Sequence, residues 1–199
     1  PPSNKSSIPC PISYGPKMFL DIRFDEVIFS NLDDGESPPQ DVEVYGYLRA
    51  SSESMTHYLN LADWIGLVSL CPDEDGFITN QNSSPAGCPV SFRDGTHSLL
   101  DQRLCRSKKY TNCTESGWDF NNNTIRLLME ESDSLTITVK MIDSDGGSGN
   151  DLVCEGIYQI PGQSILDWHK IKNQPFTLTG SQTGSGNCQI KGVMNAVSP

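Results

Sequence analysis

The chain has 199 residues, of which 36% are hydrophobic, and its formal net charge at pH 7 is −11. This acidity argues against nucleic-acid binding, which needs clustered Lys and Arg for phosphate contacts. No apolar run approaches the ~20 residues of a membrane-spanning helix. The 17 glycines and 13 prolines recur at short intervals, which favours a single strand-rich domain over residues 1–199.

The first predicted element is a strand over residues 19–29. Apolar side chains alternate with charged ones as far as Phe24, and the apolar parity then shifts at Val27. Strict alternation is typical of a half-buried strand, and a change of parity within one indicates an extra residue. The pattern therefore predicts a β-bulge near Asp25 and Glu26.

An acidic loop follows this strand and leads into a second one. The loop contains Asp33 and Asp34 and ends at Asp41. Beyond it, residues 42–48 alternate again, with their apolar members on one parity. We expect a second half-buried strand that begins at Asp41.

The most specific motif of the chain follows a third alternating segment, residues 134–142. There the strand leads into a loop whose glycines permit a tight curl, and which carries Asp143, Asp145, Ser148 and Asp151. Converging carboxylates repel one another, and a hard dication such as calcium relieves that repulsion through oxygen ligands. The alternative is a solvated acidic turn without metal.

Together these segments resemble the C2 domain family over residues 17–197. Its first calcium loop ends with an Asp that opens a strand, as Asp41-Val-Glu-Val-Tyr45 does here, and its third loop often reads D-x-D-x-x-S-x-x-D, as residues 143–151 do. Between them, a basic stretch from Arg103 runs into a segment around Trp118, as in the family.

The resemblance implies an all-β fold, an antiparallel eight-stranded C2-like β-sandwich. Its core would comprise residues 17–50 and 101–197, with a large cysteine-containing insertion at about 51–102 where the family has a short hairpin. It also implies calcium as the cofactor, with Ser148 as a secondary ligand. The implied carboxylate ligands are Asp33 or Asp34, Asp41, Asp143, Asp145 and Asp151.

Cysteines and glycosylation sequons indicate a secreted or cell-surface protein. The seven cysteines contain no C-x-x-C pair, which argues against a zinc ribbon. Four of them lie in or beside the insertion, so we expect disulfides to cross-link that region. An odd number leaves one thiol free or paired with another chain. The predicted glycosylation sites are Asn4, Asn82, Asn112 and Asn122.

The expected function is calcium-dependent binding to a membrane surface or to an extracellular protein partner, and the extracellular C2 domains of perforin-like proteins are the nearest analogy. The loop tip at 146–150 has no large apolar residue, which favours phospholipid headgroup contact over deep insertion. The chain also fits an adhesion module that binds protein or glycan through the insertion, or a lipid-carrier sandwich with an internal pocket. Catalysis is not expected, because the neighbours Asp94, His97 and Ser98 are too close in sequence for a triad.

Overall fold

The computed structural model describes residues 16–32, 42–61, 90–99, 104–110, 116–120, 123–143, 151–182 and 186–198. Within these ranges the chain forms twelve strands and one short helix, and no helix is long and apolar enough to cross a membrane. The elements are β1 (Lys17–Ser30), β2 (Val42–Ser51), β3 (Met55–Leu61), β4 (Val90–Phe92), β5 (Gly95–Ser98), β6 (Leu104–Tyr110), β7 (Ser116–Phe120), β8 (Thr124–Glu130), β9 (Leu135–Asp143), β10 (Leu152–Ile160), α1 (Ile165–Trp168), β11 (Gln174–Ser181) and β12 (Asn187–Val197).

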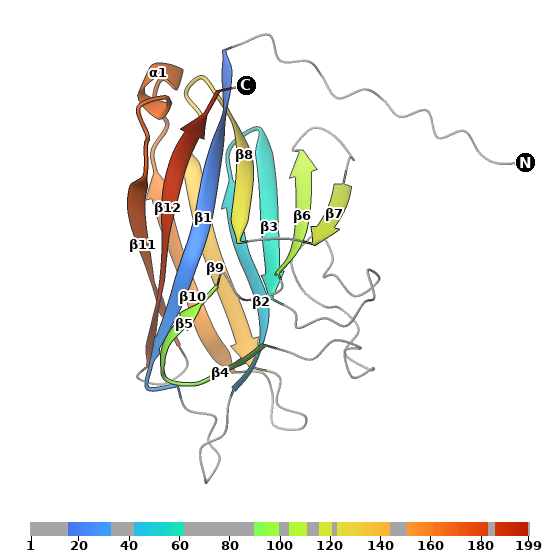
Figure 1. Ribbon diagram of the computed structural model, residues 1–199, viewed down its shortest axis with the longest axis vertical. Helices are drawn as coiled ribbons and strands as arrows, with labels where there is room; N and C mark the ends of the chain where they lie inside the picture. Colours follow the sequence, from blue (N-terminus) through green and yellow to red (C-terminus); the bar gives the residue numbers. More distant parts are fainter. Residues whose placement is uncertain are drawn as a thin grey trace, which may run out of the picture.

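The strands form one antiparallel sheet that curls into a half-barrel (Figure 1). Its order is β5-β1-β12-β11-β10-β9-β2-β3-β6-β7, with β8 also paired to β1 and β4 also paired to β2. The curl brings β8 against the β2–β3 turn, where the Ser52 hydroxyl donates to the Leu128 carbonyl oxygen at 2.8 Å. The predicted all-β, antiparallel class is confirmed.

One face of each strand packs into the core, and the alternation in the sequence predicts which residues lie on it. In β1 and β9, every second residue is buried and the residues between them are partly or fully exposed, apart from Thr138. The bulge predicted near Asp25 and Glu26 is confirmed, because the pairing of β1 with β12 shifts register between Phe24 and Glu26. The bulge keeps the apolar residues on both of its sides facing the same core, which includes Leu20, Ile22, Phe24, Val27, Phe29, Leu135, Ile137, Val139 and Met141.

The predicted number of eight strands is wrong. Three of the twelve strands, β3, β4 and β5, come from residues 51–102 and pair with β2 or β1. The prediction missed β4 and β5 because they have only three and four residues, too few to display a period of two. Residues 51–102 therefore contribute these three strands to the sheet.

Candidate functional site

Both predicted acidic loops leave the sheet at the same end, here called the loop end. The last residue of β1, Ser30, pairs with Asn187 at the start of β12, and Asn187 pairs in turn with Ser181 at the end of β11. On the other side, Asp143 at the end of β9 pairs with Val44 near the start of β2. Figure 1 shows the end of β1, the start of β2, the end of β9 and the start of β10 at this end.

Two of the predicted metal ligands fall within the described residues. Asp143 is the last residue of β9, and its partner Val44 lies three residues after Asp41. Asp151 is exposed and directly precedes β10. Outside the described residues lie Asp33, Asp34, Asp41, Asp145 and Ser148, together with the sequons at Asn4, Asn82, Asn112 and Asn122. Among the described residues, no group of three or more His, Cys, Asp or Glu side chains is placed to hold a metal ion.

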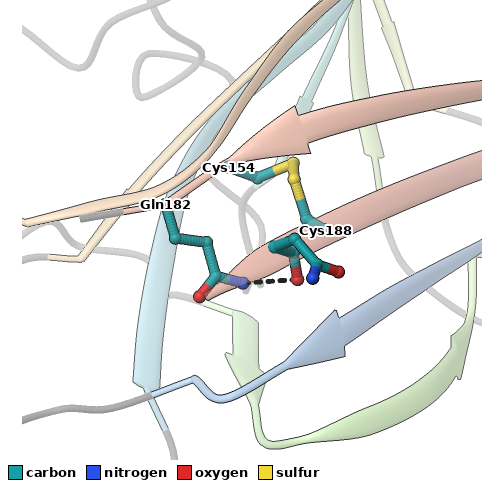
Figure 2. Close-up of a disulfide and its surroundings, with 4 residues drawn as sticks. Cys154, Gln182 and Cys188 are labelled. Carbon is teal, nitrogen blue, oxygen red and sulfur yellow. Dashed lines mark hydrogen bonds between the residues drawn. A yellow bond between two sulfur atoms is a disulfide. The ribbon is translucent and has the colours of Figure 1, made fainter. Parts of the chain in front are cut away.

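A buried disulfide cross-links β10, the strand that follows the 143–151 loop, to β12. Cys154 of β10 is bonded to Cys188 of β12, and both are fully buried. Figure 2 shows this pair beside Gln182, whose side-chain amide donates to the Asn187 carbonyl oxygen at 2.9 Å. Cys154 follows Asp151 by three residues, so the disulfide fixes β10 close to the point where the loop enters it.

Glycine makes room for this disulfide. Strand β11 lies between β10 and β12 in the sheet, and its Gly180 pairs with Cys188. A Cβ atom on Gly180 would lie 2.6 Å from the Cys188 sulfur and 2.8 Å from the Glu155 carbonyl oxygen. The cross-link passes a strand that has no side chain at this position. Sequence reasoning predicted disulfides without pairing them, and this arrangement of strands was the missing information.

Aromatic side chains from the end of β1 and from β4 and β5 pack together. The ring centroids of Phe29 and Phe92 are 5.2 Å apart, and His97 lies 5.0 Å from Phe92. The Nε2 atom of His97 is 2.7 Å from the Arg93 carbonyl oxygen. Asp94 instead accepts a hydrogen bond from the Leu32 backbone N–H at 2.6 Å, so these contacts describe structural roles for both residues.

The end of the sheet opposite the loop end contains a buried carboxyl group with a structural role. Asp133 is 5% exposed, and burial raises the pKa of its carboxyl, although it accepts from the Glu130 N–H at 3.0 Å and the Ser54 hydroxyl at 3.2 Å. Burial also opposes ionisation of Glu53, but hydrogen bonds from the hydroxyl and amide of Ser134 lower the pKa of Glu53 overall. These bonds join the β2–β3 and β8–β9 turns.

Comparisons with known proteins add little. No family model matches the chain, and no characterised protein matches it in sequence. Human GIVD cytosolic phospholipase A2 is structurally similar over 94% of this chain and 17% of its own length, with 14% sequence identity and a TM-score of 0.34. The chain thus spans only a small part of that protein, and a likeness at this level carries no argument about function.

Proposed function

We propose that the chain is a calcium-binding, C2-like β-sandwich module of a secreted or cell-surface protein. Its core would comprise residues 17–50 and 101–197, with the insertion at about 51–102. The observation that supports this function is the common end from which the 33–41 and 143–151 loops leave the sheet. Asp143 pairs with Val44, so the end of β9, which leads into the 143–151 loop, lies beside the start of β2, which follows the 33–41 loop.

Charge supports calcium at this end. Five carboxylates that converged on one site would repel one another, and calcium is a dication that such oxygen ligands favour. The proposed ligands are Asp33 or Asp34, Asp41, Asp143, Asp145 and Asp151, with Ser148 as a secondary ligand. The whole chain has a net charge of −11. Calcium would cancel the part of this charge that lies at the loop end and allow the loop end to contact anionic headgroups.

The disulfide supports the extracellular compartment, because such bonds persist mainly in oxidising surroundings. The sequons at Asn4, Asn82, Asn112 and Asn122 agree with it. We infer a role in binding a membrane surface or an extracellular protein rather than in catalysis or nucleic-acid binding.

A calcium titration by calorimetry tests the site. The wild-type chain should bind with a dissociation constant of roughly 0.1–1 mM, as other extracellular calcium modules do. Asp145→Asn should weaken binding by about tenfold or more, because the cation loses a charged ligand. The matched control is Asp167→Asn, since Asp167 is exposed in α1 and its carboxylate pairs with Lys170 at 2.7 Å. It should leave the affinity unchanged, and no heat of binding by the wild-type chain at millimolar calcium would refute the proposal.

Flotation with phosphatidylserine vesicles separates the possible binding partners. The membrane function predicts that the chain floats with the vesicles in calcium and not in chelator. Calcium binding without flotation would favour the adhesion module that binds protein or glycan. An apolar ligand retained in native mass spectrometry would favour the lipid carrier.

A further inference from the structure

The segment Val90–Leu99, here called the strap, pairs with both strands that flank the first acidic loop. Its strand β4 pairs with the start of β2, where Val42 lies opposite Phe92. Its strand β5 pairs with the end of β1, where Phe29 lies opposite Gly95. In the sheet order β1 and β2 are separated by β12, β11, β10 and β9. The strap therefore links the two sides of the curled sheet at the loop end, as Figure 1 shows.

The strap is fixed to the core on its inner side. Phe92 is 1% exposed and belongs to the hydrophobic core, and His97 lies 6.1 Å from the ring of Phe29. The backbone N–H of Leu99 donates to the Asp25 carbonyl oxygen at 2.9 Å. Because the strap is held at these points, it can act as a fixed support for the part of the chain that contacts its outer side.

Asp94, at the turn between β4 and β5, contacts the chain as it enters the first acidic loop. Its Oδ1 accepts the Leu32 N–H at 2.6 Å, and Leu32 is followed directly by Asp33 and Asp34. The preceding Asn31 has a φ of 58°, so the chain turns sharply here. A hydrogen bond at this distance to a charged acceptor is of the stronger kind.

A second contact limits the chain from the side of β12. A Cβ atom placed on Gly186 would lie 2.9 Å from the Asn31 carbonyl oxygen. The chain leaving β1 thus passes close to the start of β12 at Asn31 and is hydrogen bonded to Asp94 at Leu32. Its direction at Leu32 is set before the first acidic residue of the loop.

We propose that Asp94 is a positioning residue of the calcium site, which acts through the Leu32 amide and not as a metal ligand. This inference rests on the proposed function, and it assigns part of residues 51–102 to the assembly of the site. By fixing Leu32, the strap would set the direction in which the first acidic loop starts, and so help its carboxylates meet the same cation as those of the 143–151 loop.

Hydrogen exchange at the Leu32 amide tests the contact in calcium-free protein. Asp94→Ala removes the acceptor and should speed exchange by about tenfold, because exchange follows local opening. Asp94→Asn retains an acceptor oxygen and should keep the rate within about twofold of the wild-type rate. Asp167→Ala, the matched change of an exposed aspartate in α1, should have no effect. An unchanged rate in Asp94→Ala would overturn the inference whatever happens to calcium.

Calcium affinity, measured by calorimetry on the same variants, tests the consequence. Asp94→Ala should weaken binding by about fivefold, the order expected from loss of one hydrogen bond, while Asp94→Asn should stay within about twofold of the wild-type chain. Equal losses in both variants would mean that Asp94 acts through its charge and would overturn the positioning role. Calcium binding that Asp94→Ala leaves unchanged would refute the positioning role alone, whereas no binding by the wild-type chain would refute the proposed function and this role with it.

Discussion

Removing the disulfide between Cys154 and Cys188 should cost a large share of the stability of the chain. The two cysteines are 34 residues apart in sequence, and a cross-link that closes a loop of this length lowers the entropy of the unfolded chain by an equivalent of about 4 kcal/mol. Replacing both with Ala also removes two fully buried sulfur atoms. The free energy of unfolding should therefore fall by at least about 4 kcal/mol, out of a total of about 5–15 kcal/mol for a typical domain.

Guanidinium unfolding, followed by tryptophan fluorescence, measures this loss. The chain has seven cysteines, and the double change leaves the five that are not part of this bond. It therefore does not alter which pairs those five can form. The control is Thr179→Ala, because Thr179 is an exposed neighbour of Gly180 on β11 and its loss should stay within about 0.5 kcal/mol. A loss below about 1 kcal/mol in the double variant, with the bond intact in the wild-type chain by peptide mapping, would refute the reasoning from loop closure.

Two further predictions concern stability. Gly192→Ala should lower the free energy of unfolding by about 1–3 kcal/mol or more, because its Cβ would lie 2.0 Å from the Arg23 carbonyl oxygen and 2.7 Å from the Phe176 ring; denaturant unfolding with an unchanged midpoint would contradict this. Because burial raises the pKa of Asp133, the folded state resists its ionisation, so the wild-type chain should lose stability relative to Asp133→Asn as the pH rises above about 4. Melting temperatures of the two proteins across pH 3–8 measure this, and a difference that does not vary with pH would contradict it.

Strand positions and the bulge were accessible from sequence because alternation records which side of a strand is buried. In β1 the parity shift at Val27 was enough to locate an irregularity that the pairing with β12 confirms. In β9 the same pattern identified the buried members, but it placed Thr138 on the outer side, where it is in fact buried. Arg49, its cross-strand partner, donates to the Thr138 hydroxyl at 3.1 Å, so a neighbouring strand determines this burial.

The strap and the disulfide were not accessible from sequence because both depend on the order of strands in space. Strand β5 has four residues, and its burial pattern alone shows no period. The pairing of Cys154 with Cys188 follows from the placement of β10 and β12 on either side of a glycine of β11. Periodicity describes one strand at a time, whereas these features join strands far apart along the chain.

The supports at the loop end have a common physical logic if the loops bind calcium as we propose. Carboxylates that converge on an empty site repel one another, and that repulsion favours separation of the strands that carry them. The disulfide holds β10 to β12, and the strap pairs with both β1 and β2. Strand β9 is held between β2 and β10 by pairing on both sides. Each strand that flanks an acidic loop is therefore held by a contact that requires no metal, so loss of calcium should raise the mobility of the loops while the sheet stays folded.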